Sequence, residues 1–100
     1  MYDGFSPLVW IWLEKLGFCA RGEAHEFTRN GRIAIGGELP VTTFGGSQGE
    51  GRLHGMGHVR EGAMQVMGRA GDRQVKDLSN CLVALGFDAV PGWVLMLSSG

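Results

Sequence analysis

Residues 45–58 read GGSQGEGRLHGMGH, a stretch dense in glycine. It follows a strand-like run, residues 38–43, and precedes a run with helical spacing, residues 59–67. Glycine adopts positive φ without strain and lets backbone N–H groups come close to a ligand. Between a strand and a helix, such a loop directs its N–H groups toward one point, which suits a carbonyl oxygen or an anion. A solvated surface loop fits the composition equally well.

An apolar helix is expected near the start of the chain. Ser6 and Pro7 are typical of an N-cap and a first helical position, and the run 8–16 ends before a glycine. The first two turns are apolar on every side, so a single core-facing side leaves much of this helix uncovered. We therefore expect the chain to self-associate, as a dimer or larger oligomer that buries Trp10 or Trp12.

Between this helix and the glycine-rich loop we expect irregular chain and short strands. Residues 18–29 are polar and indicate a solvated loop, because no rigid element is evident there that would hold metal ligands in place. Residues 32–35 are expected to pair briefly as a strand. Residues 38–44 form the next predicted strand, and Pro40 places it at a sheet edge or at a strand start.

The helix predicted after the loop, residues 59–67, is amphipathic. Apolar side chains such as Val59 and Val66 recur on one side of it. Glu61 and Gln65 lie on the other side, which we expect to be its polar face.

Two strands are predicted to close the chain. The continuous apolar runs at 81–85 and 93–97 are typical of strands. Glycine and proline residues in the stretch 86–92 predict a turn, so the two strands should be antiparallel neighbours. The predicted fold class is α/β, with a single domain over residues 1–100.

Composition and charge exclude several kinds of protein. The formal net charge is −1, with acidic and basic side chains mixed along the chain, which argues against nucleic-acid binding. The apolar run 8–13 is too short to span a bilayer and no basic leader opens the chain, so we expect a soluble, cytoplasmic protein. Cys19 and Cys81 are isolated and indicate reduced thiols more than a disulfide or a metal site.

Several motifs resemble those of the thiolase superfamily. The segment GRIAIGGELPVTTFGG at 31–46 resembles "GRIALGGELPVNTSGG" of the sterol-carrier-protein thiolases and of the lipid-transfer acyl-CoA aldolases of steroid side-chain breakdown. YDGFS at 2–6 resembles the same motif in that group, and GRLHGMGH at 51–58 resembles its "GYLHGMNH". AGDRQV at 70–75 is similar to its "AGxRQV". These motifs are in order, correctly spaced and cover essentially the whole chain.

The resemblance implies a fold, a substrate and partners. The chain would be the closing part of the C-terminal half of a thiolase-like subunit: helix, strand, glycine loop, helix and antiparallel strand pair, within a mixed sheet covered by helices on both faces. A coenzyme A thioester would be the substrate, with no covalently bound cofactor and no metal. The partner protein would be an upstream thiolase half or a small OB-fold, zinc-ribbon protein, as in two-component aldolases of this group.

The resemblance also implies catalytic residues. The nucleophilic cysteine of thiolases lies upstream of the matched segment, and Cys81 stands about a turn too early for their second catalytic cysteine. The aldolase subgroup uses two tyrosines as acid–base groups, whose positions fall on Tyr2 and Arg52. Arginine stays protonated and cannot be a general base, but it would polarise a carbonyl or hold a carboxylate. Asp3 would orient the loop. The alternatives are a frayed Tyr2 and a solvated Arg52.

Two histidines and three glycines complete the predicted site. By resemblance, His54 and His58 would form hydrogen bonds beside the thioester. Their spacing of four residues leaves two alternatives, a metal pair and structural histidines. Gly45, Gly46 and Gly55 would offer their backbone N–H groups to the coenzyme A thioester.

Two functions of different classes follow. In the first, the chain is the C-terminal segment of a thiolase-like acyl-CoA lyase or acyltransferase, akin to acetyl-CoA acetyltransferases and lipid-transfer proteins. It would act by retro-aldol cleavage or acyl transfer on a steroid or fatty acyl-CoA, and would be inactive alone because the half with the nucleophilic cysteine is absent. In the second, it is a non-catalytic module that binds acyl chains or sterols, or that oligomerises. Activity that requires an upstream partner favours the first, and a folded dimer without turnover favours the second.

Overall fold

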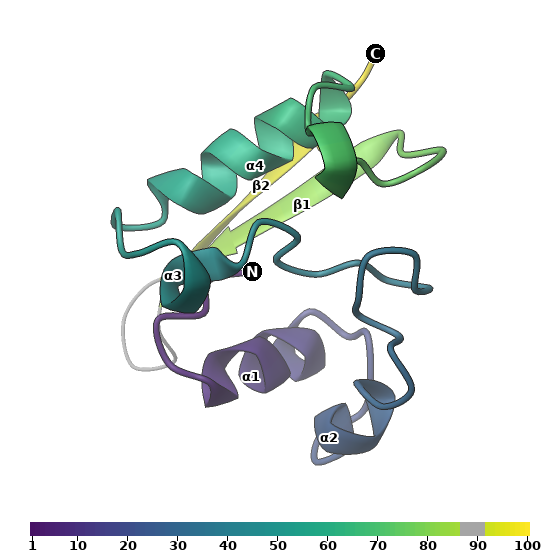
Figure 1. The fold of residues 1–100 in the computed structure, drawn as a ribbon. Helices are drawn as coiled ribbons and strands as arrows, with labels where there is room; N and C mark the ends of the chain where they lie inside the picture. The colour runs from purple at the N-terminus through teal and green to yellow at the C-terminus, as the bar shows by residue number, and fades with distance from the viewer. Residues whose placement is uncertain (87–91) are drawn as a thin grey trace.

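A two-stranded sheet lies between helices in the computed structural model, which describes residues 1–86 and 92–100. Helix α4 runs along the strands, and helices α1 and α2 lie on the opposite side (Figure 1). The elements in chain order are α1 (Pro7–Lys15), α2 (Ala24–Phe27), α3 (Gly46–Gly49), α4 (Met56–Val66), the short 3-10 helix η1 (Gly71–Arg73), β1 (Asn80–Leu85) and β2 (Trp93–Ser98). This arrangement confirms the predicted α/β class.

Strands β1 and β2 are antiparallel, as predicted. Their register pairs Asn80 with Ser98 at one end and Leu85 with Trp93 at the other. Strand β1 goes from an exposed first residue to three buried final residues, so its C-terminal half reaches the core. A turn was predicted for residues 86–92. Residues 87–91 of it lie outside the described part of the chain.

The core forms where α1, the N-terminal segment and β1 meet. Its buried members are Tyr2, Leu8, Val83 and Leu85. Partly buried apolar side chains from α1, α4 and β2 pack around them: Ile11, Trp12, Val59, Leu95 and Leu97. Burying a large apolar side chain fully stabilises a fold by about 1.5–3 kcal/mol, so a cluster of this size provides a modest core.

Helix α1 is formed as predicted, although its start differs in detail. Pro7 occupies the first turn, where its missing N–H costs no hydrogen bond. Ser6 makes no side-chain cap hydrogen bond, so the predicted capping role is wrong. Leu8 and Leu13 are buried, whereas Trp10 is 43% exposed. Part of the apolar surface of α1 is therefore left open. Among residues 1–86 and 92–100, no helix combines the length and hydropathy that crossing a bilayer requires.

Two predicted strands are wrong. Residues 32–35 lie in turns, and residues 38–44 pair with neither strand of the described sheet. The second segment instead folds back on the preceding turn, because Leu39 N–H donates to the Arg32 carbonyl at 3.0 Å. Pro40 has no N–H to contribute to a ladder. The described sheet is consequently an antiparallel pair, and it contains no parallel strand of the mixed sheet implied by resemblance.

The segment 18–29 is more ordered than a solvated loop. It contains the short helix α2, whose first residue, Ala24, is buried. The Ala24 N–H donates to the Glu14 side chain at 3.3 Å, which holds α2 against α1.

Candidate functional site

One carboxylate oxygen joins the beginning of the chain to the glycine-rich loop. Asp3 Oδ1 accepts a hydrogen bond from the Ser47 backbone N–H at 2.8 Å and lies 2.9 Å from His58 Nε2. All three residues are buried. Since a carboxylate oxygen only accepts, the short contact requires a proton on His58 Nε2. Two motifs that are far apart in the sequence, YDGFS and the glycine-rich stretch, are thus held together, which agrees with the orienting role expected for Asp3.

The His58 imidazole is enclosed by two aromatic rings. The Tyr2 ring lies 5.5 Å from it, and the Phe44 ring meets it edge-on at 5.1 Å. Burial lowers the pKa of His58 below its usual value, and the hydrogen bond to Asp3 opposes that shift only in part. At neutral pH the ring is therefore neutral, and it acts as a fixed donor to Asp3.

Tyr2 and Arg52 both approach Gly4. Arg52 Nη2 donates to the Gly4 carbonyl at 2.7 Å, and its guanidinium lies 5.0 Å from the centre of the Phe5 ring. A Cβ placed on Gly4 would lie 2.8 Å from the Tyr2 hydroxyl, so this hydroxyl is also close to Gly4. Two predicted site residues therefore lie around one backbone position.

Neither a frayed Tyr2 nor a freely solvated Arg52 fits this geometry. Tyr2 is 8% exposed, and its backbone N–H donates to the Ala84 carbonyl of β1 at 2.7 Å. Arg52 belongs to an exposed stretch of loop, but its guanidinium is anchored on the N-terminal segment. The Arg52 guanidinium is therefore a cation with a fixed orientation beside Gly4.

His54 lies apart from this cluster. It is exposed, precedes α4 and has a φ of 50°, whereas His58 is buried within α4. The two imidazoles therefore lie in different environments, one exposed and one buried. Within residues 1–86 and 92–100, no three His, Cys, Asp or Glu side chains come together in the way that a metal site requires.

Two of the three predicted loop glycines are required by packing. A Cβ on Gly46 would collide with the Asp3 carboxylate and with Thr42, and Gly46 has a φ of 67°. Gly55 has a φ of 87°, and a Cβ there would lie 2.7 Å from the Leu85 side chain. Gly45 is exposed before α3, but its N–H donates to the Thr42 carbonyl at 3.1 Å and is not free for the thioester that was predicted to bind there.

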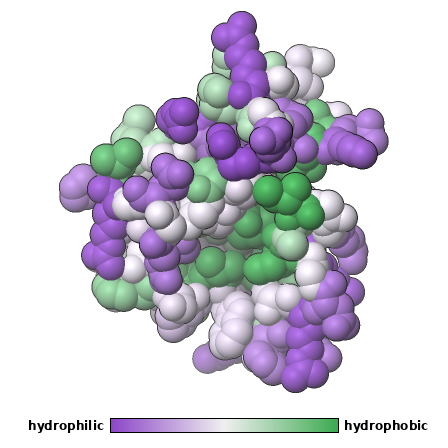
Figure 2. Space-filling view, viewed as in Figure 1, coloured by the Kyte–Doolittle hydropathy of each residue, from purple (hydrophilic) through white to green (hydrophobic). Residues whose placement is uncertain are grey.

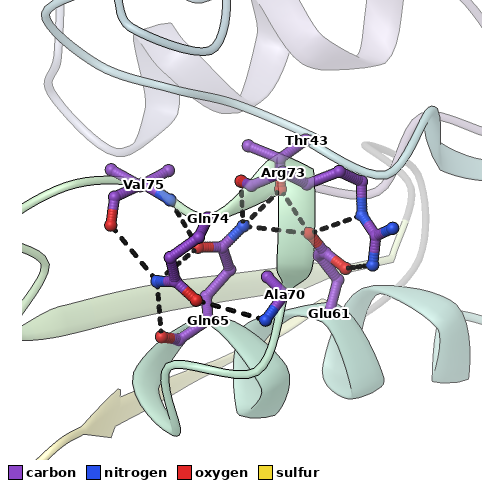
Figure 3. Close-up of polar contacts among 7 residues, drawn as sticks. All are labelled: Thr43, Glu61, Gln65, Ala70, Arg73, Gln74 and Val75. Carbon is purple, nitrogen blue, oxygen red and sulfur yellow. Dashed lines mark hydrogen bonds and ion pairs between the residues drawn. The ribbon is translucent and has the colours of Figure 1, made fainter.

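A second cluster of polar side chains connects α4 to Thr43, just before the glycine-rich loop, and to residues 70–75 (Figure 3). Glu61 Oε1 accepts from the Thr43 hydroxyl at 2.8 Å and from Gln65 Nε2 at 3.0 Å, while Arg73 Nη2 donates to Glu61 Oε2 at 3.0 Å. Gln65 also donates to the Arg73 carbonyl at 2.7 Å. Gln74 bonds to the backbone and side-chain oxygens of Gln65.

Sequence reasoning missed this cluster. Glu61 is 4% and Gln65 is 3% exposed, so the expectation that they occupy an outer polar face of α4 is wrong. Burial alone would raise the pKa of the Glu61 carboxyl, but hydrogen bonds from Arg73, Thr43 and Gln65 outweigh it and hold the pKa below its usual value. The available signal was AGDRQV at 70–75, which supplies the arginine and the second glutamine.

Cys81 is not placed as a nucleophile. A Cβ on Gly62 would lie 3.4 Å from its Sγ, so the thiol points at α4. Burial raises the pKa of the Cys81 thiol, which keeps it protonated near neutral pH.

The fold and the cluster around Asp3 define the class of protein. It is an α/β domain in which a glycine-rich turn before a helix is fastened to a short aromatic N-terminal motif. Residues 1–86 match the family model described as thiolase C-terminal domain-like, and the chain belongs to that family.

Three similar proteins place the chain more narrowly. It is 48% identical over 86 residues to a steroid side-chain-cleaving aldolase of Thermomonospora curvata, covering 86% of this chain and 22% of that protein. It is 48% identical over 68 residues to the 17-hydroxy-3-oxo-4-pregnene-20-carboxyl-CoA lyase of Mycobacterium tuberculosis, covering 68% and 18%. A solved structure of the Ltp2-ChsH2(DUF35) aldolase superposes with a TM-score of 0.89 and 42% identity, covering 98% of this chain and 25% of that chain. The chain thus spans a quarter or less of the length of these proteins.

Proposed function

We propose that this chain is the C-terminal part of a thiolase-like acyl-CoA lyase that acts on a steroid or fatty acyl-CoA, by retro-aldol cleavage or acyl transfer. The observation that carries the proposal is the link from Asp3 to Ser47 and His58, which holds Tyr2 and Arg52 around Gly4. Its coenzyme A thioester substrate suits a cytoplasmic location.

Each side chain has a role that follows from its chemistry. In a retro-aldol cleavage, a base removes the proton of a β-hydroxyl group, the bond between the α and β carbons breaks, and negative charge collects on the thioester oxygen. Tyr2 is the group in this chain that can exchange a proton with the substrate hydroxyl. Arg52 remains a cation and stabilises the developing charge or holds a carboxylate. Asp3 and His58 are positioning residues, because their polar atoms bond to each other and to the loop backbone.

The chain is proposed to need a second polypeptide for activity. The similar proteins are nearly four times as long as this chain, and the cluster described above has no nucleophilic cysteine. The proposed partner is the upstream part of a thiolase-like subunit, with an OB-fold, zinc-ribbon protein as a further component.

A reconstitution experiment tests this function. The chain is mixed with the part of the Thermomonospora curvata aldolase that precedes the matched residues, and turnover of 17-hydroxy-3-oxo-4-pregnene-20-carboxyl-CoA is followed by mass spectrometry. We expect no turnover by the chain alone and measurable turnover by the mixture. Tyr2→Phe should lower the rate by about 100-fold, the usual size of a lost acid–base group. Trp10→Phe, a substitution on the exposed side of α1, is the control. A mixture that associates without turnover, or a Tyr2→Phe mixture of normal rate, would contradict the proposal.

A non-catalytic role is the second candidate, and an apolar cavity of about 460 Å³ beside β1 favours it. In this role the isolated chain would bind an acyl chain or a sterol, or serve to oligomerise. Micromolar binding of a steroid acyl-CoA to the chain alone, with no turnover in any mixture, would support it.

A further inference from the structure

The guanidinium of Arg52 has more hydrogen-bond donors than its own chain uses. Its Nη2 atom donates to the Gly4 carbonyl at 2.7 Å, and its Cζ atom lies 5.0 Å from the centre of the Phe5 ring. Arginine carries five N–H donors in a planar fork. Within residues 1–86 and 92–100, no further hydrogen bond and no acidic partner reaches this side chain. The remaining donors are therefore available to an anion from outside the chain.

The acidic side chains near this cation are engaged elsewhere or exposed. Asp3 is buried, and its Oδ1 atom is held by the Ser47 N–H and by His58 Nε2. Glu50 is exposed, and in the described part of the chain no ion pair joins it to Arg52. An oriented arginine without a partner suits a carboxylate or a phosphate, since both accept two parallel N–H bonds.

This cation lies close to the group that exchanges a proton with the substrate in the proposed reaction. A Cβ on Gly4 would be 2.8 Å from the Tyr2 hydroxyl, and the Gly4 carbonyl accepts from Arg52. A Cβ and a carbonyl oxygen of one residue lie within about 3.5 Å, so the Tyr2 hydroxyl and Arg52 Nη2 are at most about 9 Å apart. With a hydrogen bond of about 2.8 Å at each end, the two bound substrate groups need be separated by only about 3–4 Å.

A carboxylate on the acyl group meets this separation better than a phosphate of coenzyme A. The phosphates lie beyond the pantetheine arm, roughly 15 Å from the thioester sulfur when that arm is extended. A carboxylate attached to the β carbon instead lies about 3 Å from the oxygen of a β-hydroxyl group. Arg52 is therefore placed to read the acyl group of the substrate.

The cavity beside β1 is a poorer place for such a carboxylate. Apolar side chains gather in the centre of the face that Figure 2 shows, and the acidic residues Glu61 and Asp77 line the cavity together with Lys76. A carboxylate there would meet apolar walls and negative charge, which makes its transfer from water costly. Arg52 does not line that cavity. The cavity and the Arg52 guanidinium thus suit different chemical groups.

We propose that Arg52 selects a β-hydroxyacyl-CoA whose β carbon carries a carboxylate, so that cleavage releases an oxo acid. Tyr2 takes the hydroxyl proton, the bond between the α and β carbons breaks, and its electron pair passes to the thioester enolate. The β carbon leaves as the carbonyl of the oxo acid, and the enolate takes up one proton to become the shortened acyl-CoA. Atoms and electrons balance without a further reactant. This inference rests on the proposed function and names its substrate class.

Two acyl-CoAs of similar shape test the selection. Succinyl-CoA has the carboxylate on its β carbon, 4-methylpentanoyl-CoA has an isopropyl group instead, and neither has a β-hydroxyl group that could be cleaved. Calorimetry measures their affinities for the mixture of this chain with the upstream part of the Thermomonospora curvata aldolase. We expect succinyl-CoA to bind about tenfold more tightly or better, as a charge-assisted hydrogen bond predicts. Equal affinities, or tighter binding of 4-methylpentanoyl-CoA, would overturn the proposal.

Variants of two arginines locate the preference. Arg52→Gln removes the cation and should reduce the preference for succinyl-CoA to about threefold or less, whereas Arg52→Lys, which keeps the charge without the planar fork, should retain part of it. Arg60→Gln is the matched control, because Arg60 is exposed on α4 and its loss changes the net charge equally. An Arg52→Gln mixture that keeps the full preference would overturn the proposal. So would an equal loss of affinity for both acyl-CoAs, which a contact with the phosphates or the thioester predicts.

NMR of the unaltered chain gives an answer even if a variant misfolds or the mixture does not associate. Gly4, Phe5 and Arg52 all belong to this chain, so the carboxylate site needs no second polypeptide. Succinyl-CoA at millimolar concentration should shift the Arg52 Nε–H signal, and 4-methylpentanoyl-CoA should leave it in place. Equal shifts with the two acyl-CoAs, or no shift with succinyl-CoA, would overturn the proposal.

These results are separable from the test of the proposed function. A mixture that prefers succinyl-CoA but cleaves no β-hydroxyacyl-CoA supports the carboxylate site and contradicts the lyase. A mixture that cleaves 17-hydroxy-3-oxo-4-pregnene-20-carboxyl-CoA while it binds the two probes equally supports the lyase and contradicts the carboxylate site.

Discussion

Two regions of the molecule differ in whether their polar groups have hydrogen-bond partners. Around Glu61, Gln65 and Arg73, charged and amide side chains are buried, and every buried side-chain donor and acceptor in the described part of the chain has a partner. Along the outer edge of β1, the backbone groups of Leu82 and Asn80 have no hydrogen-bond partner among residues 1–86 and 92–100. The first region is complete within this chain. The second region is an uncovered strand edge, a kind of surface to which another strand can add.

The largest expected effect comes from breaking the complete region. Glu61→Ala leaves Arg73 and Gln65 without their acceptor, and we expect a loss of about 2–4 kcal/mol in unfolding free energy, because Arg73 is partly exposed. Glu26→Ala, which removes an exposed ion pair with Arg29, should cost about 0–1 kcal/mol. Urea unfolding of both variants measures the difference. Equal losses would show that the Glu61 cluster does not carry the stability assigned to it.

The next effect concerns the close approach of Asp3 to the loop. Gly46→Ala places a Cβ against the Asp3 carboxylate at a positive φ, and should cost about 1–3 kcal/mol. Gly49→Ala, in the same short helix but facing open space, should be neutral or stabilising by about 0.4–1 kcal/mol. Thermal unfolding compares the two. A Gly46→Ala variant as stable as Gly49→Ala would mean that the loop is not fastened through Asp3.

The pH dependence of stability tests both buried groups. The pKa of His58 is lowered in the fold, so the unfolded chain takes up its proton first and stability falls as pH drops below about 6.5. The pKa of Glu61 is also lowered, so a further loss begins below about 4.5. Urea midpoints between pH 8 and pH 3 should show both steps. His58→Gln should remove the upper step alone, and Glu61→Gln the lower one. An upper step that survives in His58→Gln would refute its assignment.

The smallest expected effect is on self-association, which the sequence predicts to involve the exposed apolar side of α1. Its apolar Trp10 is partly exposed, so self-association through this helix remains a prediction from the sequence. Trp10→Gln should weaken a dimer by about threefold to tenfold, equivalent to about 1 kcal/mol. Trp93→Gln, a comparably exposed tryptophan on β2, is the control. Sedimentation velocity at micromolar concentration measures both, and a monomeric unaltered chain would remove this prediction.

The elements that were predicted correctly have strong local signals. Helix α1, helix α4 and the pair β1–β2 each follow from an apolar run or from helical spacing. The strand predicted at 38–44 is wrong, because this segment bonds to a nearby turn and not to β1 or β2. Strand pairing is decided by distant segments, which local composition does not report.

The site was predictable in part for the same reason. Motif resemblance identified Tyr2, Arg52 and His58, which the structure brings close to Gly4 and Asp3. It gave no reason to separate His54, which lies outside the cluster. The burial of Glu61 was missed because helical spacing alone describes one helix and not the residues that pack on its polar side.

Amide hydrogen exchange in the isolated chain tests the contrast between the two regions most directly. Ser47 N–H donates to Asp3, and Val75 N–H donates to Gln65, whereas Leu82 N–H lies on the edge of β1 that faces away from β2. We expect the Ser47 and Val75 amides to exchange at least tenfold more slowly than the Leu82 amide. A Leu82 amide protected as well as these two would contradict an open edge on β1.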